Sequence, residues 1–469
     1  MKQLSTLIIL LFLHIGSLIA QQDKVDAIIR REMQSRRIPG VQLAVVKDGK
    51  IILERNYGIA NIEQNIPVTD STLFSINSCT KAFTGVAIMQ LVQAGKIDLQ
   101  APVGRYLDSL PANWQPVTIR QLLTHVSGLP DVLQLKDVSN EKQAWQQVMA
   151  KPMDFPTGTQ FSYNQTNYAL LGKIIDKYSG MPFLEFFQQQ QFRPAGMKYT
   201  VSGDFFSVIP HSADTYIYAR YLYGEKLPTA KLIKNYEEFA PYRRAAAGLK
   251  STAHELASWI AALQRGQLLN APALKTLWTA GSYNNGQPTQ WALGWVTKPR
   301  PAHAAIIATG GARSAFFVYP EDHLGIVVLT NLNGGTPEDF IDEIAGVFNP
   351  AIPLSDPVTY LRMKLDTVGY SHAMEIYQQA KKSIPAFQPG ENDLNDWAYR
   401  MMAQGKLKNA LAIFQLNTYL YPDSWNVYDS YGEALLKDGQ QPAAEKMYRK
   451  SVELNPQNSH GKAVLEQLH

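Results

Sequence analysis

Strand-like runs lie at the two ends of residues 25–350, and the stretch between them is mainly helical in pattern. At the near end, Val41–Val46 and Ile51–Glu54 flank an Asp-Gly pair, which favours a tight hairpin turn. At the far end, Phe316–Tyr319 and Leu324–Thr330 repeat this antiparallel pattern. We expect an α/β (α+β) fold in which both ends build one antiparallel sheet. The helices between them would form an inserted subdomain, with a cleft at the junction.

The C-terminal stretch lacks strand signals and repeats itself at an offset of 34 residues. Five pairs of positions match at that offset: Gly405 with Gly439, Ala410 with Ala444, Phe414 with Tyr448, Leu420 with Leu454, and Pro422 with Pro456. The period is that of tetratricopeptide repeats, whose stacked helix pairs bury what no pair buries alone. Residues 360–382 would be a degenerate earlier pair and 459–469 a capping helix. An ordinary helical bundle is the alternative.

The chain divides into four segments by pattern. Residues 1–20 join a basic residue, a short apolar run and a small residue at the end, the layout of a secretory signal. That run is too short to span a membrane, and a buried core segment is the alternative. We expect an α/β domain at 21–350, a helical linker or degenerate repeat at 351–389, and the helical repeats at 390–469. After signal removal the protein would be periplasmic or secreted, without a membrane span.

Composition excludes several classes of function. The 44 basic and 40 acidic residues give a net charge of +4 without basic runs, which leaves nucleic-acid binding unsupported. The one cysteine, Cys79, excludes an intramolecular disulfide and a cysteine-rich metal site. The nine histidines form no ligand motif, so we expect neither a metal nor another cofactor.

Ser78 and Lys81 stand three residues apart, before an apolar run typical of a buried helix. On a helix this spacing puts both side chains on one face, and the helix N-terminus favours a developing oxyanion. Burial would also lower the pKa of the lysine toward that of a base. Ser78 is therefore the candidate nucleophile. The spacing alone is weak evidence, because Ser459 and Lys462 show it too without preceding a buried helix.

Tyr163 lies in a polar loop directly before a second apolar helix and is the candidate partner base. A phenolate near Lys81 would be favoured by the positive charge, and proton passage between the serine and a leaving group needs such a residue. The alternative is a loop tyrosine that packs its ring and donates to water.

Thr309, Gly310 and Gly311 end a strand-like run, and glycine lets a backbone approach a substrate closely. The amides of Ser78 and Gly311 would together form an oxyanion hole with two donors. A plain hairpin turn is the alternative.

Taken in order, these motifs resemble the serine β-lactamase and penicillin-binding-protein superfamily, especially its class C and esterase branch. Four further stretches resemble family landmarks and stand in family order, so that the resemblance covers about 25–350: Ile38–Val41, Thr118–Pro130, Ala247–Thr252 and Val328–Asn331. The resemblance implies a β-lactamase/transpeptidase-like fold and an acyl-enzyme cycle on Ser78. Lys81 and Tyr163 would share proton transfer, with Ser78 and Gly311 as the oxyanion donors.

The chain departs from the family pattern at two positions. Gln165 stands where Tyr-x-Asn ends with an asparagine, and Ala308 stands where the third motif normally opens with Lys or His. The second change removes a cation that helps to hold a substrate carboxylate, so we expect poor β-lactam hydrolysis. We assign substrate binding to Gln165, Thr309, Gly310 and Arg313. Arg313 would restore positive charge, unless it is an exposed arginine solvated at a strand end.

Three weaker candidates remain. The stretch 201–245 is crowded with aromatic residues and would wall the cleft or act as a lid, with a packed insertion as the alternative. His125 reads as a structural residue, since no local motif marks a Ser-His-Asp triad. Cys79 reads as a packed small thiol, because one step along a helix turns it away from the Ser78 face.

The leading hypothesis is an exported serine hydrolase that acts on an ester, amide or small peptide, either esterase-like or D-amino-acid peptidase-like. The rival is a penicillin-binding-like scaffold that has lost its activity. In that reading, the helical repeats bind a peptide or protein partner.

Overall fold

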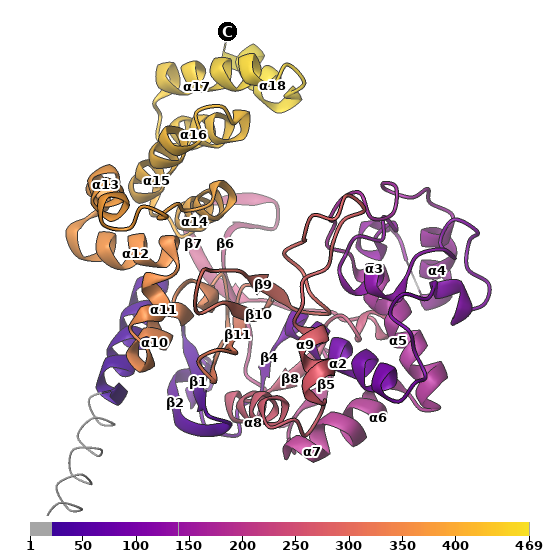
Figure 1. Ribbon diagram of the computed structural model, residues 1–469. Helices are drawn as coiled ribbons and strands as arrows, with labels where there is room; N and C mark the ends of the chain where they lie inside the picture. The colour runs from indigo at the N-terminus through magenta and orange to yellow at the C-terminus, as the bar shows by residue number, and fades with distance from the viewer. Residues whose placement is uncertain (1–20, 139, 469) are drawn as a thin grey trace, which may run out of the picture. The chain divides into compact units, whose positions relative to one another are not determined.

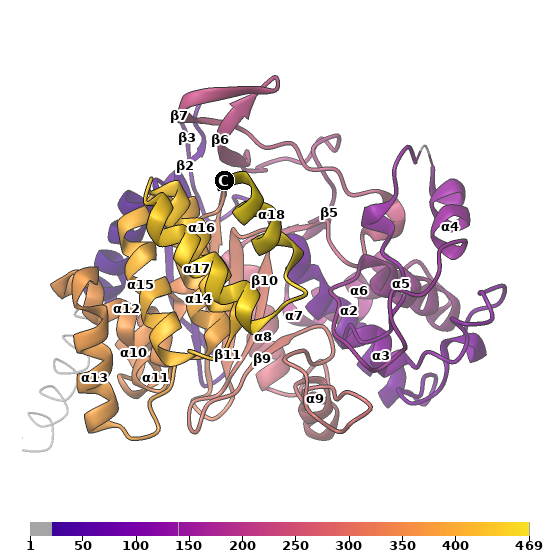
Figure 2. The same ribbon diagram turned by 90° about the horizontal axis from the view of Figure 1, so that it is seen from above.

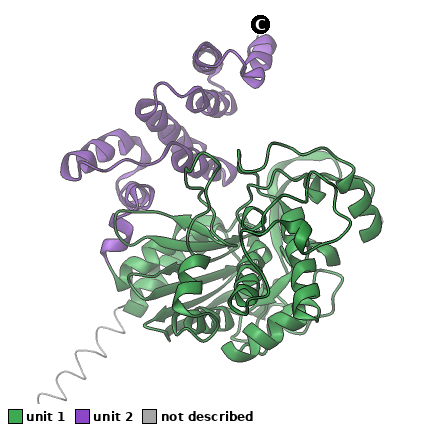
Figure 3. Ribbon diagram, turned by 45° about the vertical axis from the view of Figure 1, so that its right-hand side comes forward, with its two compact units in different colours: residues 1–349 green, residues 350–469 purple. Residues whose placement is uncertain are grey.

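The computed structural model describes residues 21–138 and 140–468. They divide into two compact units, the first ending at Asn349 and the second beginning at Pro350 (Figure 3). The expected secretory signal, residues 1–20, lies outside the described residues. Within those residues no helix has the length and apolar character that a membrane crossing requires.

A seven-stranded antiparallel sheet forms the centre of the first unit, in the order β3-β2-β1-β12-β11-β10-β9. Its strands are β1 (Gly40–Lys47), β2 (Lys50–Asn61), β3 (Ile66–Pro67), β9 (Val296–Lys298), β10 (Ala305–Gly310), β11 (Ser314–Tyr319) and β12 (Leu324–Thr330). The prediction that both ends of this region build one sheet is confirmed, because β1 pairs with β12. The α/β class with an antiparallel sheet is confirmed as well.

Turn chemistry explains the first hairpin of this sheet. Asp48 and Gly49, between β1 and β2, have φ angles of 51° and 69°, the left-handed pair that a two-residue hairpin turn needs. Every residue of β12 is buried, as expected of a central strand covered on both faces. The predicted hairpin of β11 and β12 is also present, with Tyr319 opposite Leu324.

Helices occupy most of the middle of the first unit, and α3 to α6 gather to the right of the strands in Figure 1. Residues 21–36 are helical, and the helices that follow in this unit are α2 (Thr80–Gln93), α3 (Ile119–Leu123), α4 (Glu141–Met149), α5 (Gln165–Ser179), α6 (Phe183–Phe187), α7 (Arg193–Ala195), α8 (Ala253–Gln264), α9 (Ala271–Leu277) and α10 (Ile341–Phe348). Helix α2 is buried along most of its length and has no polar face. Phe83 of α2 stacks on Trp259 of α8 with ring centroids 4.0 Å apart, which joins the helical part to the helix that covers β1 and β12.

The aromatic-rich stretch 201–245 contains strands that the sequence pattern did not reveal. It holds β5 (Val201–Ser202), β6 (Tyr216–Leu222) and β7 (Glu225–Lys234), and β6 and β7 pair as an antiparallel hairpin. This hairpin projects from the unit beside β2 and β3 (Figure 2), and Tyr221 and Tyr223 near its tip are exposed. The hairpin is therefore no packed core insertion. A second small sheet joins β4 (Phe74–Ser75), β8 (Leu249–Ser251) and β5.

The second unit is entirely helical in its described residues. Its helices are α11 (Ala351–Leu354), α12 (Pro357–Val368), α13 (Ala373–Ser383), α14 (Glu391–Ala403), α15 (Leu407–Leu420), α16 (Trp425–Lys437), α17 (Gln441–Leu454) and α18 (Ser459–Leu468). The starts of α14 and α16 are 34 residues apart, and so are the starts of α15 and α17. Ala410 and Ala444, matched at this offset, are both fully buried. The tetratricopeptide assignment stays a prediction.

Asp342 provides a stability test for the first unit. Its carboxylate, 1% exposed, accepts hydrogen bonds from Lys298 Nζ at 2.9 Å, Arg300 Nη2 at 2.5 Å and Tyr319 Oη at 2.7 Å. Burial alone would raise the pKa of Asp342, but the two cations outweigh it and hold that pKa well below its usual range. Asp342→Asn should lower the free energy of unfolding by about 3–5 kcal/mol at neutral pH, because it removes a buried negative charge that faces the buried Arg300 guanidinium and the half-buried Lys298 ammonium group.

Calorimetric unfolding of the full chain checks this expectation. The folded-state pKa is depressed, so the stability that Asp342 contributes is present above about pH 4 and fades as the pH falls further. The difference in free energy of unfolding between the wild type and Asp342→Asn should shrink over the same pH range. The matched control is Asp108→Asn, which breaks a solvent-exposed pair with Lys177 and should change little. Equal losses of unfolding free energy in Asp342→Asn and Asp108→Asn would contradict the stabilising role of the buried Asp342 carboxylate.

Candidate active site

Ser78 lies in a 3₁₀ turn (η1, Asn77–Cys79) that leads directly into α2. The α-helix begins only at Thr80, so Ser78 precedes the helix rather than standing on it, and Lys81 is in its first turn. The turn places the Ser78 amide at the positive end of the helix, where negative charge is stabilised. Cys79 is buried among core side chains, as predicted, and its Sγ lies 3.6 Å from the Ser314 carbonyl oxygen.

The Lys81 side chain is fully buried. Its Nζ donates to Gln165 Oε1 and to the carbonyl oxygen of Ala246, both at 3.0 Å, and lies 4.5 Å from the centroid of the Tyr163 ring. Within the described residues no carboxylate is at ion-pair distance from this amine. Burial lowers the pKa of Lys81 to about 7, with Asp131 opposing the shift. The two acceptors match the two hydrogens of a neutral amine, so the lone pair stays available to take a proton.

Tyr163 keeps 37% of its surface exposed, yet its hydroxyl lies within hydrogen-bonding reach of the Ser78 and Gln165 side chains. Loss of water around the hydroxyl raises the pKa of Tyr163 to about 12, although those two hydrogen bonds oppose the shift. The expectation of a phenolate is therefore wrong, because the loss of water around the hydroxyl outweighs the two hydrogen bonds that favour its ionised form. At neutral pH, Tyr163 is a phenol that can donate a proton.

His125 supports the Tyr163 ring, a contact that the sequence did not indicate. The imidazole lies 4.6 Å from Tyr163 and 5.2 Å from Tyr168, centroid to centroid, and Trp291 meets it edge-on at 4.9 Å. Its Nδ1 accepts a hydrogen bond of 3.0 Å from the Asn164 amide, and burial lowers the pKa of His125 well below its ordinary value. A buried neutral imidazole of this kind fixes its neighbour's position, which agrees with the structural role predicted for His125.

The N-terminus of helix α5, which begins at Gln165, places the side chains of Gln165 and Asp131 near Lys81. Asn164 caps the helix, its side chain accepting from the Asn167 amide, which fixes the chain directly after Tyr163. Asp131 accepts from the Gln165 amide at 3.2 Å and from the Leu133 amide at 3.1 Å. Gln165 therefore holds the lysine, whereas the sequence assigned it to substrate binding. No motif marked Asp131 as a neighbour of the site.

The end of β10 lies against the Ser78 turn. A Cβ added to Gly310 would come within 2.0 Å of the Ile76 carbonyl oxygen and 3.1 Å of the Ser78 nitrogen, so only glycine permits this approach. Among the described strands, β9 pairs only with residues 305–307 of β10, which leaves 308–310 paired on the β11 side alone. Thr309 is half-buried and Gly311 is exposed on this segment. The sequence-assigned oxyanion residues Ser78 and Gly311 thus belong to adjoining chain segments.

The hairpin-turn alternative for the same glycines also holds. Gly311 and Ala312 have φ angles of 57° and 51°, and the Arg313 amide donates to the Gly310 carbonyl at 3.1 Å, which closes a two-residue turn. Such a turn does not conflict with an oxyanion role, because the Gly311 amide lies at the exposed tip of the strand.

Ala308 and Arg313 are both buried, and this decides what each contributes to the charge of the site. Ala308 is buried, so its methyl group packs in the core where the resemblance implied a cation. Arg313 is also buried, at 1% exposure, and its Nη2 pairs with Glu237 Oε1 at 2.5 Å. The alternative of an exposed, solvated arginine is therefore wrong. Its charge is balanced by Glu237, which weakens the assignment of Arg313 to a substrate carboxylate.

The described residues hold no group of three or more His, Cys, Asp or Glu side chains that could bind a metal ion. The site just described consists of a hydroxyl, an amine, a phenol and backbone amides. Groups of these kinds perform nucleophilic and general acid–base chemistry.

Comparison with known proteins gives a family match over most of the first unit. The family model described as Beta-lactamase matches residues 25–347. Protein flp of Staphylococcus aureus (strain MW2) is 28% identical over 329 residues, which cover 66% of this chain and 63% of that protein. Penicillin-binding protein 4* of Bacillus subtilis (strain 168) is 27% identical over 290 residues, covering 59% and 64%. The chain thus covers less than two thirds of either relative.

Solved structures give the same picture of the fold. A penicillin-binding protein from Bacillus halodurans superimposes with a TM-score of 0.58 at 28% identity, covering 68% of this chain and 98% of that one. An octameric penicillin-binding protein homologue from Pyrococcus abyssi gives 0.61 at 24% identity, covering 74% and 81%. A class C beta-lactamase gives 0.57 at 23% identity, covering 67% and 92%. The two latter matches bear on the fold alone.

The low pKa of Lys81 can be measured directly. In a ¹³C NMR titration of protein labelled at lysine Cε, with the Lys81 signal assigned from Lys81→Arg, we expect a midpoint near pH 7. Asp131→Asn should move the midpoint to lower pH, because it removes a negative charge that favours the protonated amine while keeping an oxygen for the Leu133 and Gln165 amides.

The control for this titration is Asp154→Asn, a substitution of an exposed carboxylate that should leave the midpoint in place. A wild-type midpoint near 10, the value of a solvated lysine, would show that the amine is not desolvated. A midpoint that Asp131→Asn left unmoved would remove Asp131 from the electrostatics of the site.

Proposed function

The chain belongs to the Beta-lactamase family, and from that membership we propose that it is a serine hydrolase that forms an acyl-enzyme on Ser78. The proposed substrates are esters, amides or small peptides. Hydrolysis would proceed by acylation of Ser78 and release of the acyl group to water.

The observation that carries the proposal is the buried Lys81 amine in the helical turn next to Ser78, with a pKa of about 7. A base works best when its pKa lies near the working pH, and an ordinary lysine is protonated there. The Tyr163 phenol is the complementary acid, since its pKa of about 12 keeps its proton in place at neutral pH. The two groups have pKa values displaced in opposite directions from that of a solvated lysine–tyrosine pair, as separate acid and base roles require.

The proposed cycle balances its protons within these residues. Ser78 Oγ attacks the carbonyl carbon while Lys81 takes the serine proton, and the Ser78 and Gly311 amides stabilise the oxyanion. The bond to the leaving group then breaks, the leaving group takes a proton from Tyr163, and Lys81 returns one to Tyr163. In deacylation, water takes the place of the leaving group and attacks the acyl carbon. Water gives a proton to Tyr163 as Tyr163 passes its own to Lys81, and Lys81 then returns a proton to Ser78 Oγ, which releases the acid and restores the Ser78 hydroxyl.

The charges around the site favour neutral substrates. Ala308 offers no cation, and the Arg313 guanidinium is buried against Glu237. A substrate carboxylate beside Ala308 would therefore lose its hydration without a counter-charge from that position or from Arg313, which is unfavourable. An uncharged ester or acyl-amide avoids that cost, so esterase-like activity is our first choice and D-amino-acid peptidase-like activity the second.

Labelling with a fluorophosphonate probe tests the nucleophile. Ser78→Ala should abolish labelling, since the probe reacts with an activated serine hydroxyl, and peptide mass mapping of the wild-type adduct should locate it at Ser78. Ser459→Ala is the matched control, because Ser459 shares the spacing to a lysine but begins a helix in the other unit. Labelling that survived Ser78→Ala would exclude Ser78. A wild-type protein that took no label would favour the rival reading of an inactive scaffold that binds a partner.

Turnover of β-lactams tests the substrate preference. We expect slow hydrolysis of a chromogenic cephalosporin, with kcat/KM lower by at least about 100-fold than for an uncharged p-nitrophenyl ester of a short acid, because the carboxylate of the lactam lacks a partner at Ala308. The methyl ester of the same cephalosporin should have a kcat/KM closer to that of the p-nitrophenyl ester, because it lacks the carboxylate. Equal kcat/KM values for the cephalosporin and its methyl ester would contradict this preference.

A further inference from the structure

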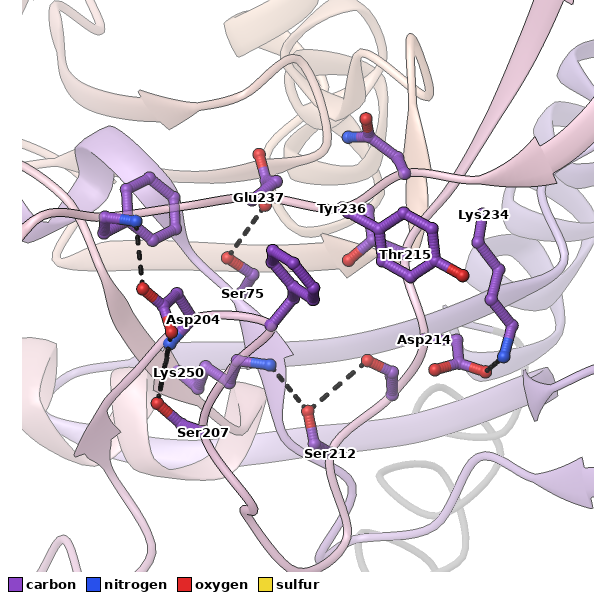
Figure 4. Close-up of a pocket in the computed structure, with 14 residues that line it drawn as sticks. Ser75, Asp204, Ser207, Ser212, Asp214, Thr215, Lys234, Tyr236, Glu237 and Lys250 are labelled. Atoms are coloured by element: carbon purple, nitrogen blue, oxygen red, sulfur yellow. Dashed lines mark hydrogen bonds and ion pairs between the residues drawn. The ribbon is translucent and has the colours of Figure 1, made fainter. Parts of the chain in front are cut away.

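Glu237 lies in the chain segment that follows β7. Its carboxylate contacts three polar side chains close to the candidate nucleophile, Ser78. Glu237 Oε1 accepts from Asn77 Nδ2 at 2.8 Å and from Arg313 Nη2 at 2.5 Å. Glu237 Oε2 lies 3.4 Å from Ser75 Oγ, a contact drawn in Figure 4. One oxygen thus joins the chain before Ser78 to the chain after Gly311.

Two of these three partners, Asn77 and Arg313, are close in sequence to a candidate oxyanion donor. Asn77 directly precedes Ser78 and has a φ of 46°, a left-handed conformation that a non-glycine residue holds only when its surroundings fix it. Arg313 follows Gly311 by two positions, and its Nε lies 3.4 Å from the Gly311 carbonyl oxygen. A Cβ added to Gly311 would come within 2.9 Å of both Arg313 Nη2 and the Asn77 side chain.

We propose that Glu237 is a positioning residue for acylation, which sets the spacing between the Ser78 and Gly311 amides by holding Asn77 and Arg313 on one carboxylate oxygen. The inference rests on the proposed function, because the two amides matter only if an oxyanion forms between them. An oxyanion hole loses effect when its donors shift by a fraction of an ångström, and single donors contribute about 100- to 1,000-fold to rate.

A purely electrostatic role predicts the opposite result. A carboxylate near a developing oxyanion is unfavourable, while the Arg313 cation is favourable, so removal of the negative charge alone would speed acylation. Glu237→Gln separates the two readings. Its amide oxygen, placed as Oε1 is, still accepts from both Asn77 and Arg313 and keeps the bridge without the negative charge. Positioning therefore predicts that Glu237→Gln acylates at a rate close to that of the wild type, whereas Glu237→Ala, which loses the bridge, acylates about 10- to 100-fold more slowly with little change in KM.

The cavity beside Glu237 permits a chemical rescue. Glu237 lines a cavity of about 210 Å³ together with Ser75, Ser212 and Lys250 (Figure 4), so a small anion can reach the place that its side chain leaves. Glu237→Ala should acylate slowly, and added sodium formate should restore at least about 10-fold of the rate by bridging Asn77 and Arg313. Formate should not speed Glu237→Gln, whose side chain still fills the space, and should not speed the wild type.

The experiment measures the second-order rate of fluorophosphonate labelling and the steady-state kcat and KM for an ester, alongside the melting temperature. The matched control is Glu238→Ala, which removes the exposed neighbouring carboxylate and should keep the wild-type rate. If Glu237→Ala melts below the assay temperature, Glu237→Gln combined with Arg313→Gln removes both charges at once and leaves no buried ion unpaired. That double variant should remain slow.

Each outcome decides the inference. Slow acylation of Glu237→Ala and of the double variant, a rate of Glu237→Gln close to that of the wild type, and formate rescue of Glu237→Ala together support positioning. Wild-type rates in folded Glu237→Ala, faster acylation by Glu237→Gln, full recovery in the double variant, or absence of formate rescue would overturn it. If the wild type does not label at Ser78, both the proposed function and this inference are overturned. If the wild type labels at Ser78 and Glu237→Ala labels at the same rate, only the positioning role of Glu237 is overturned.

Discussion

The burial of one amine governs the chemistry of the first unit. Lys81 is fully enclosed, and its nitrogen meets two neutral oxygens, from Gln165 and Ala246, in place of a carboxylate. A carboxylate in contact would have kept the lysine protonated, whereas neutral acceptors leave the cost of desolvation largely uncompensated. The amine thus lacks a carboxylate partner, and its pKa falls to about 7, close to neutral pH.

The groups around that amine come from segments far apart in the chain, and each is fixed by ordinary structural devices. An asparagine cap sets the start of α5 beside Tyr163, and glycine at position 310 lets β10 touch the Ser78 turn. The Ala312 carbonyl, in a left-handed turn, accepts from the Gly334 and Thr336 amides, which pins the tip of the β10–β11 hairpin. A rigid frame of this kind is what preorganised catalysis requires.

The sequence predicted the parts of the fold that have strong local signals. Asp48-Gly49 fixes a hairpin turn, and the uninterrupted apolar run of β12 marks a central strand, so the sheet could be foreseen. The grouping of Ser78, Lys81 and Tyr163 in space could be foreseen because each stands before or on an apolar helix in a recognisable motif, whereas their catalytic roles stay a prediction. The β6–β7 hairpin was missed, because both of its faces are partly exposed and it shows no apolar alternation.

The remaining site residues carry no local signal. Asp131, His125 and Glu237 act through contacts with residues 34, 38 and 76 or more positions away, for example Asp131 with Gln165 and Glu237 with Arg313. Only the folded chain brings such groups together. The phenolate expected at Tyr163 failed for a related reason, since the proximity of a cation can be inferred from a motif but the loss of water around a hydroxyl cannot.

The pairing of β1 with β12 sets Val41 opposite Thr330 at the centre of the sheet. Contacts between such distant parts of a chain incur a large loop-closure entropy before they contribute any stability, and they slow folding. The central sheet cannot close until nearly the whole of the first unit has been synthesised. The β10 tip and the Ser78 turn therefore meet late, and a growing or truncated chain lacks the assembled site until its last strands arrive.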